Sequence, residues 1–399
     1  MHLAVRMPPV SERRKVSMDR LIELASRSHA RALAALFVLS LALFLPGQFS
    51  VQPMDRDEPR FAQASKQMLE TGDFVDIRFQ DEARHKKPVG IYWLQTASVA
   101  VAERLGVPDA RGTIGYYRIP SLIGALATVL LTYWAALAFL SRPGALLAAA
   151  LMAGSILLGV EARLAKTDAV LTATVVAAMG ALARVWFAAV LPETHYRPGL
   201  GLALVFWIAI GVGVLIKGPI TPLIPAIVVL ILSIRERSLA WLKPLRPLMG
   251  LALVIAIALP WLAAIAWKTG GAFFAESVGK DMLGKVGGVA EKHWGPPGAY
   301  IGAFWGTFWP GAPLAALALP FAWKERRDDS LVFLIAWIVP MWLILEAMPT
   351  KLPHYVLPLF PAVAILILIA VERGALAMEG WRARLAAGLM LLIPLGLLV

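Results

Sequence analysis

Long apolar runs alternate with short polar stretches along almost the whole chain. A bilayer with a hydrocarbon core of ~30 Å needs about 20 apolar residues per spanning helix. Runs near that length predict about eleven spans, at 32–50, 118–140, 143–160, 169–190, 200–216, 219–234, 248–267, 299–321, 331–348, 353–371 and 385–399. The strands of a transmembrane barrel are much shorter and alternate in polarity. The pattern therefore predicts an all-α polytopic membrane protein with one transmembrane domain over residues 1–399.

The connection between the first two spans, residues 51–117, is long enough to contain helices of its own. Glu58 and Pro59 resemble an N-cap and a first helical residue, and Gly72 can end that helix. A second segment, which begins at Gly90, is apolar but short and is interrupted by polar residues. It predicts a helix that lies in the membrane interface rather than across the bilayer.

The final run stops at Val399 without a polar tail. We therefore expect a further C-terminal part of the protein after residue 399, with a soluble domain as one option.

Basic residues indicate the orientation in the membrane. Residues 1–31 form a basic arm, and short connections after every second span also carry Lys or Arg. The positive-inside rule then predicts a cytoplasmic N-terminus. The long loops 51–117 and 268–298 fall on the opposite side of the membrane. The chain is 59% hydrophobic, which excludes an ordinary soluble protein, and it has no cysteine, which excludes disulfides and thiolate metal sites.

Charged and polar side chains recur at helix ends on the side opposite the predicted cytoplasmic N-terminus. Ionisable groups at or within a membrane are energetically costly, so these residues are functional candidates. Taken singly, each could be a helix cap or a snorkelling anchor, but their repetition on one side favours a site. The candidates are Asp57, Glu58 and Arg60; Lys86 and Lys87; Glu161, Lys166 and Asp168 in "EARLAKTD"; Lys217 in "LIKGPIT"; Lys351, His354 and Tyr355 in "TKLPHYVLP"; and His293 in the second loop.

Five stretches, in order, resemble the landmarks of one family. They are "DRDEPRFAQASKQMLETGDF", "HKKPVGIYWLQ", "RLAKTDAVLTA", "LIKGP" and "KLPHYVLPLFPA". In sequence and order, these stretches resemble the motifs of the C-superfamily of lipid-linked-sugar glycosyltransferases. The resemblance is to the branch that contains bacterial 4-amino-4-deoxy-L-arabinose transferases and protein O-mannosyltransferases. The resemblance covers essentially the whole chain. It implies inverting transfer of a sugar from a polyprenyl phosphate to lipid A, a polysaccharide or a protein, at the periplasmic face of a bacterial inner membrane.

The resemblance also implies roles for single residues. Asp57 would be the catalytic carboxylate, with Asp168 assisting. The donor phosphate or other substrate groups would contact Arg60, Lys87, Lys217 and Tyr355, with Glu58, Lys86, His293 and Lys351 as further candidates. One departure is that the family often has Glu before the Lys-Pro pair, where this chain has Lys86.

Cofactors and partners follow from the same reasoning. No two of the six histidines are spaced i, i+4, so the sequence encodes no metal-ligand signature. We expect no required cofactor, although acids near the site could bind a divalent ion. The expected partners are membrane lipid, the lipid-linked donor and the acceptor, with no nucleic acid, and the chain is expected to act as a monomer.

Two other classes compete with this interpretation. A transporter or flippase of an anionic lipid-linked substrate would also place charges in a helical bundle, but near the bilayer midplane and often within repeated halves. A scaffold subunit would not need a set of acids and cations. A nucleotide-sugar enzyme is disfavoured because no Gly-rich phosphate loop follows a strand.

Overall fold

The computed structural model describes residues 19–54, 56–191, 197–282, 295–376 and 379–396. Within this part of the chain, regular structure is helical except for one two-stranded hairpin, which confirms the predicted all-α class. The α-helices are α2 (His29–Phe44), α3 (Asp57–Thr71), α4 (Gly90–Arg104), α5 (Ile114–Ala136), α6 (Arg142–Ala153), α7 (Ile156–Glu161), α8 (Asp168–Val190), α9 (Leu200–Lys217), α10 (Ile220–Glu236), α11 (Pro247–Thr269), α12 (Ala272–Phe274), α14 (Ala299–Thr307), α15 (Gly311–Lys324), α16 (Asp329–Ala347), α17 (Phe360–Glu372) and α18 (Gly380–Gly396). The remaining elements are β1 (Arg78–Phe79), β2 (Glu82–Ala83), the 3₁₀ segments η2 (Ala240–Leu245) and η4 (Pro353–Leu359), and the π-helical segment η3 (Ala275–Met282).

In the described part of the chain, six helices are long and apolar enough to cross a membrane. They are α5, α8, α9, α11, α16 and the continuous segment of η4 with α17, and the bent pair of Asp19–Ser26 with α2 could add a seventh. Shorter helices α6, α10, α14, α15 and α18 cover the other predicted runs. The multi-pass architecture is therefore confirmed, whereas the count of eleven spans stays a prediction.

Several boundaries differ from those predicted. The run 143–160 forms two helices, α6 and α7, and the run 299–321 forms α14 and α15 with a break at residues 308–310. The predicted N-cap at Glu58 is wrong, because α3 begins at Asp57 and its N-cap, Arg56, makes no side-chain capping bond. Gly72 ends the helix as predicted, with a φ of 71° that suits glycine.

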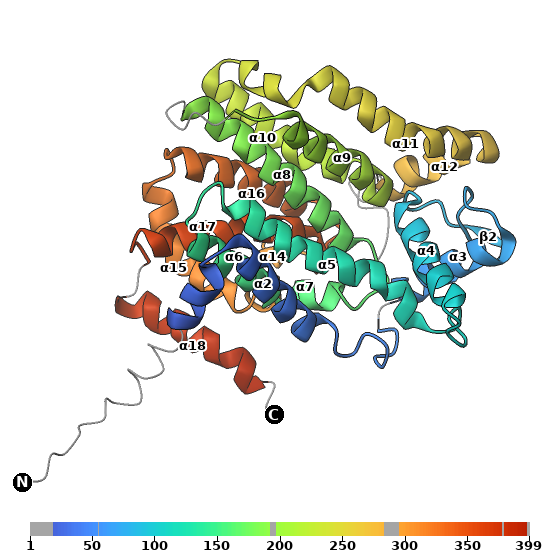
Figure 1. Ribbon diagram of the computed structural model, residues 1–399, viewed down its shortest axis with the longest axis horizontal. Coiled ribbons are helices and arrows are strands. Elements are labelled where there is room, and N and C mark those ends of the chain that lie inside the picture. The colour runs from blue at the N-terminus through green and yellow to red at the C-terminus, as the bar shows by residue number, and fades with distance from the viewer. Residues whose placement is uncertain (1–18, 55, 192–196, 283–294, 377–378, 397–399) are drawn as a thin grey trace, which may run out of the picture.

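The first long loop and the end of α11 gather at one end of the molecule. In Figure 1, α3, α4 and the β1–β2 hairpin lie at the right, close to α12, and α18 lies at the opposite end. Between these ends α5 packs along α8, and α8 packs along α9. Gly124 of α5 permits this close packing, because a Cβ there would lie 2.7 Å from the backbone nitrogen of Val170.

The predicted break after Lys217 is confirmed. Gly218 has a φ of 69° and a ψ of −140°, a conformation open essentially to glycine alone, and Pro219 follows. Helix α9 therefore ends at Lys217 and α10 starts at Ile220. The break places Lys217 at a helix end, where its side chain can reach neighbouring elements.

Candidate active site

A buried ion pair fixes the start of α3 to the helical bundle. The side chain of Glu58 is fully buried and accepts two hydrogen bonds from Arg118 of α5, at 2.6 Å from Nε and 3.1 Å from Nη2. Arg118 Nη1 also donates to the carbonyl oxygens of Gln48 and Val51. A buried pair is favourable only when its remaining polar atoms are also bonded, as they are here. This environment makes Glu58 a structural residue of α3.

The same region of α3 and α4 holds the turn between α7 and α8. The backbone N–H of Ala165 donates to Glu58 Oε1 at 3.0 Å, and its carbonyl accepts from Gln95 Nε2 of α4 at 3.0 Å. Gln95 is in turn bonded to Ser65 of α3. Both backbone groups of Ala165 are thus satisfied from the first loop, which explains a buried glutamine in an apolar helix.

Asp57 directly precedes Glu58, which is bonded to the turn between α7 and α8 at Ala165. It is half-buried, and its Oδ1 lies 3.7 Å from Arg60 Nη1 on the next turn of α3. The predicted pairing of these two side chains is present. Asp57 and Arg60 lie at the start of α3, outside the residues that line the cavity described below.

Five ionisable side chains meet where the turn approaches α9 and η4, and we call them the charged cluster. Lys217 Nζ donates to Asp168 Oδ1, and Lys166 Nζ lies 3.8 Å from Glu161 Oε1. His354 lies between the two acids, with Nδ1 3.6 Å from Glu161 and Nε2 3.9 Å from Asp168. Both carboxylates are almost completely buried, so each depends on its cationic neighbour.

A cavity of about 330 Å³ opens beside the charged cluster. Its polar wall contains Lys86, Lys87, Lys217 and Tyr355, all predicted from sequence, and the Lys217 ammonium lies 5.2 Å from the centroid of the Tyr355 ring. Its other walls are mainly apolar and come from α10 and α16, which contribute Ile220, Leu223, Met341, Ile344 and Leu345. We call this space the lysine-lined cavity. It combines cations at one side with hydrocarbon at the other.

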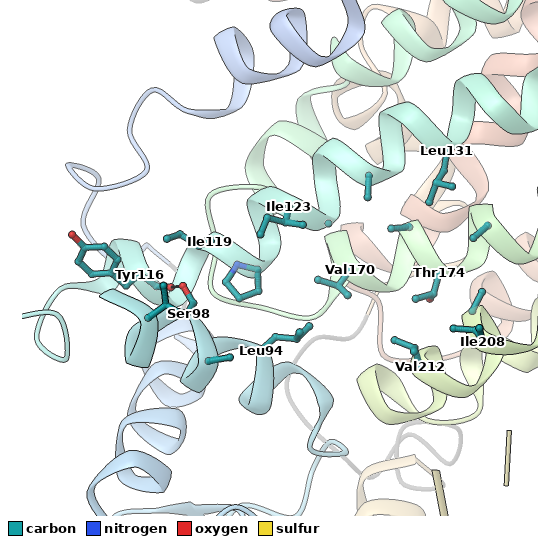
Figure 2. A pocket seen from close by; sticks show the side chains of 18 of the residues that line it. Leu94, Ser98, Tyr116, Ile119, Ile123, Leu131, Val170, Thr174, Ile208 and Val212 are labelled. Atoms are coloured by element: carbon teal, nitrogen blue, oxygen red, sulfur yellow. Dashed lines mark hydrogen bonds between the residues drawn. The ribbon is translucent and has the colours of Figure 1, made fainter. Parts of the chain in front are cut away.

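A longer hollow of about 820 Å³, the apolar groove, lies between α4, α5, α8 and α9. Figure 2 shows Leu94, Ile123, Val170 and Ile208 from these four helices around it. Among the described residues, those that line the groove are all uncharged. On α8, Val170 lines the groove and the next residue, Leu171, lines the lysine-lined cavity. The two hollows therefore lie on neighbouring faces of α8.

The structure places one other predicted residue, Lys351, differently. Lys351 Nζ donates to the carbonyl oxygens of Glu346 and Met348 at the end of α16, and Lys351 does not line the cavity. His293 lies outside the described residues. The sequence placed Glu161, Lys166 and His354 among the charged candidates, but it assigned none of them a role in the site. Their positions next to Asp168 and Tyr355 in two of the quoted stretches were the available signal.

Glu161, Asp168 and His354 could also hold a metal ion. One ligand atom from each lies within 4.8 Å of the others. However, Lys166 and Lys217 already approach the two carboxylates, so a divalent cation would lie beside two ammonium groups. Like charges at such short range repel strongly in a poorly solvated site. The arrangement fits an ion-pair network better than a metal centre.

The chain is similar to known proteins in sequence and in fold. The family described as dolichyl-phosphate-mannose-protein mannosyltransferase matches residues 86–263. The undecaprenyl phosphate-alpha-4-amino-4-deoxy-L-arabinose arabinosyl transferase of Edwardsiella ictaluri (strain 93-146) is 30% identical over 374 residues, which cover 91% of this chain and 63% of that protein. The protein of the same name from Yersinia pestis (strain Pestoides F) is 26% identical over 348 residues, covering 87% and 60%. The chain thus spans somewhat less than two thirds of the length of these relatives.

Solved structures show that the fold is shared. ArnT from Cupriavidus metallidurans bound to undecaprenyl phosphate aligns with a TM-score of 0.72 at 19% identity, over 85% of this chain and 60% of that one. The Archaeoglobus fulgidus oligosaccharyltransferase aligns with a TM-score of 0.55 at 14% identity, over 92% of this chain and 53% of that one.

The described residues form a multi-pass helical protein with at least six candidate membrane spans, and this fold is shared with ArnT and the archaeal oligosaccharyltransferase. In sequence, the chain is similar to the aminoarabinose arabinosyl transferases and to the dolichyl-phosphate-mannose-protein mannosyltransferase family.

Proposed function

We propose that this protein transfers a sugar from a polyprenyl-phosphate donor to an acceptor at the periplasmic face of the inner membrane, with inversion at the anomeric carbon. The observation that carries the proposal is the lysine-lined cavity. Three lysines and Tyr355 face a space whose other walls are apolar, which suits a phosphate joined to an isoprenoid chain. The names of the relatives support the same class of donor.

The cations would stabilise the leaving group. In the transfer, an acceptor oxygen forms a bond to the anomeric carbon while the bond from that carbon to the phosphate oxygen breaks, and the electron pair leaves with the polyprenyl phosphate. Lys87 and Lys217 would offset the charge that develops on this phosphate, and such fixed charges act strongly in a water-poor site. Lys86 lines the same wall and adds a third ammonium group.

A carboxylate would accept or orient the proton of the acceptor. We assign this role to Asp57, with Arg60 beside it, and give Asp168 the role of holding Lys217 in place. Because the acceptor approaches from the side opposite the leaving phosphate, a single displacement inverts the anomeric centre. If the acceptor is itself a phosphate, little base strength is needed and Asp57 mainly positions it.

The hydrocarbon of a lipid substrate would use the apolar surfaces. The α10 and α16 walls of the lysine-lined cavity can receive the first isoprene units, and the apolar groove can receive a further length of lipid chain. We further propose that the N-terminus is cytoplasmic, that the chain acts as a monomer, and that the long loops 51–117 and 268–298 lie in the periplasm within one transmembrane domain.

Replacement of the proposed base tests the assignment. Asp57→Asn in purified protein should lower sugar transfer from a polyprenyl-phosphate donor by at least about a hundredfold, the usual range for a catalytic acid or base, while polyprenyl phosphate still binds. Asp81→Asn, at an exposed position in the same loop, is the matched control and should transfer normally. Unchanged transfer by Asp57→Asn would remove Asp57 from the mechanism.

The transporter interpretation makes a different prediction for the same preparation. It requires labelled lipid to move between the leaflets of proteoliposomes while no sugar is transferred. The concentration of cations at the lysine-lined cavity, next to the end of α9 and the first-loop segment 86–88, favours the transferase.

A further inference from the structure

Two segments far apart in the sequence border the lysine-lined cavity. Residues 86–88 come from the first long loop, and residues 277–278 come from η3 after α11. His85 directly precedes the first segment, and Glu276 directly precedes the second. Because His85 contacts Glu276, the two borders of the cavity are joined at their bases.

His85 is held on three sides. Its Nε2 lies 2.9 Å from Asp76 Oδ1, and its Nδ1 lies 3.4 Å from Glu276 Oε2. The ring also packs edge-on against Phe273, with 5.6 Å between centroids, and only 4% of the residue is exposed. We call the contacts of His85 with Asp76 and Glu276 the His85 bridge. The hydrogen bond at Nε2 and the aromatic neighbour set the orientation of the ring, and they keep Nδ1 close to the Glu276 carboxylate, although this nitrogen makes no hydrogen bond.

Neighbouring contacts hold the same loop against α11 but stop short of the cavity. Trp261 Nε1 donates to the carbonyl oxygen of Val75 at 3.1 Å, and Lys268 pairs with Asp73. Burial raises the pKa of Asp73, yet its hydrogen bonds, first that from Lys268, bring this pKa below its ordinary value. The pair is therefore charged at neutral pH. The His85 bridge extends this interface to the lysine-bearing segment.

We propose that His85 is a positioning residue, which sets the spacing between residues 86–88 and residues 277–278 so that both borders of the cavity engage a polyprenyl phosphate at once. The identity of this ligand rests on the proposed function, whereas the spacing does not. Ordering a loop during binding costs affinity, and a contact that orders it beforehand removes that cost. His85 makes no contact with the ligand in this role and acts through the segment that it precedes.

Binding of polyprenyl phosphate to the purified protein in lipid nanodiscs tests the proposal. His85→Ala should weaken binding about tenfold, equivalent to about 1.4 kcal/mol, and His85→Gln, which keeps one donor, should lie between this variant and the native protein. Glu276→Gln should also weaken binding. The double variant should bind no more weakly than His85→Ala alone, because both changes remove the same His85–Glu276 contact. Glu103→Gln is the matched control, since it removes the partner of Arg111 in the same loop away from the cavity.

Cross-linking measures the spacing without reference to the ligand. The chain has no cysteine, so Lys86→Cys with Val278→Cys creates a single reactive pair across the cavity. A short bismaleimide should join this pair readily in the native background and much more slowly after His85→Ala. Equal cross-linking in both backgrounds, or additive losses of binding in the double variant, would overturn the proposal. Cross-linking that depends on His85 in a protein that binds no polyprenyl phosphate would support the positioning role and refute the proposed function.

Discussion

Two lysines chosen from the sequence for the same role have different environments. Lys217 pairs with Asp168 and lies above the Tyr355 ring at the wall of the lysine-lined cavity. Lys351 donates instead to two backbone carbonyls at the end of α16. A cation at a helix C-terminus is stabilised by the helix dipole and satisfies carbonyls that have no partner in the helix. Lys351 is therefore placed for helix stability.

These environments predict opposite phenotypes for the two lysines. Lys217→Ala should weaken polyprenyl phosphate binding by roughly 10- to 100-fold, since a hydrogen bond to a charged group is worth about 1.5–3 kcal/mol. Lys351→Ala should leave binding unchanged and lower the thermal unfolding temperature in detergent. Ligand titration and a thermal shift assay on both variants measure the two effects. Similar losses of affinity in both variants would contradict the distinction.

At the scale of helices, the apolar groove is chemically uniform. Its two small hydroxyl groups are both bonded to backbone carbonyls, Ser98 to that of Tyr116 and Thr174 to that of Leu171. A ligand in the groove would thus find almost no unsatisfied polar partner and can gain mainly from apolar contact. The walls α5, α8 and α9 are candidate membrane spans, so the chemistry of the groove suits a hydrocarbon chain.

Filling the groove should interfere with a lipid substrate. Ala127 lines it on α5 and is only partly buried, so Ala127→Phe adds bulk into open space. Displacing about two methylene groups of a bound chain costs roughly 1.6 kcal/mol, and the KM for the lipid whose chain occupies the groove should rise about tenfold. Ile255→Phe on the exposed side of α11 is the control. If the KM values of both donor and acceptor stay at the native level, the groove holds no substrate chain.

Local sequence signals predicted most elements but few of their breaks. Apolar runs located the spans, and Gly218-Pro219 marked the end of α9 because its backbone conformation requires glycine. The breaks after α6 and α14 carry similar local signals, Gly154-Ser155 and Pro310-Gly311, but each lies inside an apolar run that alone predicts one continuous span. Glu58 fitted a helix-start pattern, yet its partner Arg118 is sixty residues away in sequence, and no local rule could have paired them.

At the scale of the whole molecule, the site is assembled from segments spread over the chain. Lys86, Lys217 and Tyr355 were predicted individually, and their meeting in one cavity follows from the packing of the first loop, α9 and η4. The sequence placed them on one side of the membrane but gave no distances. For the same reason, the approach of His354 to two acids of a different segment could not be derived from spacing.

The predicted orientation of the chain can be tested directly, because there is no native cysteine. Asp81→Cys lies in the exposed β1–β2 hairpin, and Ser238→Cys lies in the exposed connection after α10. A membrane-impermeant maleimide should label the first variant in intact spheroplasts and the second only after the membrane is opened. Labelling of Ser238→Cys alone in intact spheroplasts would reverse the orientation.

The Glu58–Arg118 pair also has a consequence for membrane insertion. Arg118 belongs to α5, a candidate span, and a lone arginine within hydrocarbon costs several kcal/mol. Glu58 neutralises it only once α3 has packed against the bundle, so we expect α5 to reach its final position together with the first long loop rather than before it. Insertion of α5 would then depend on the folding of a loop that precedes it in the sequence.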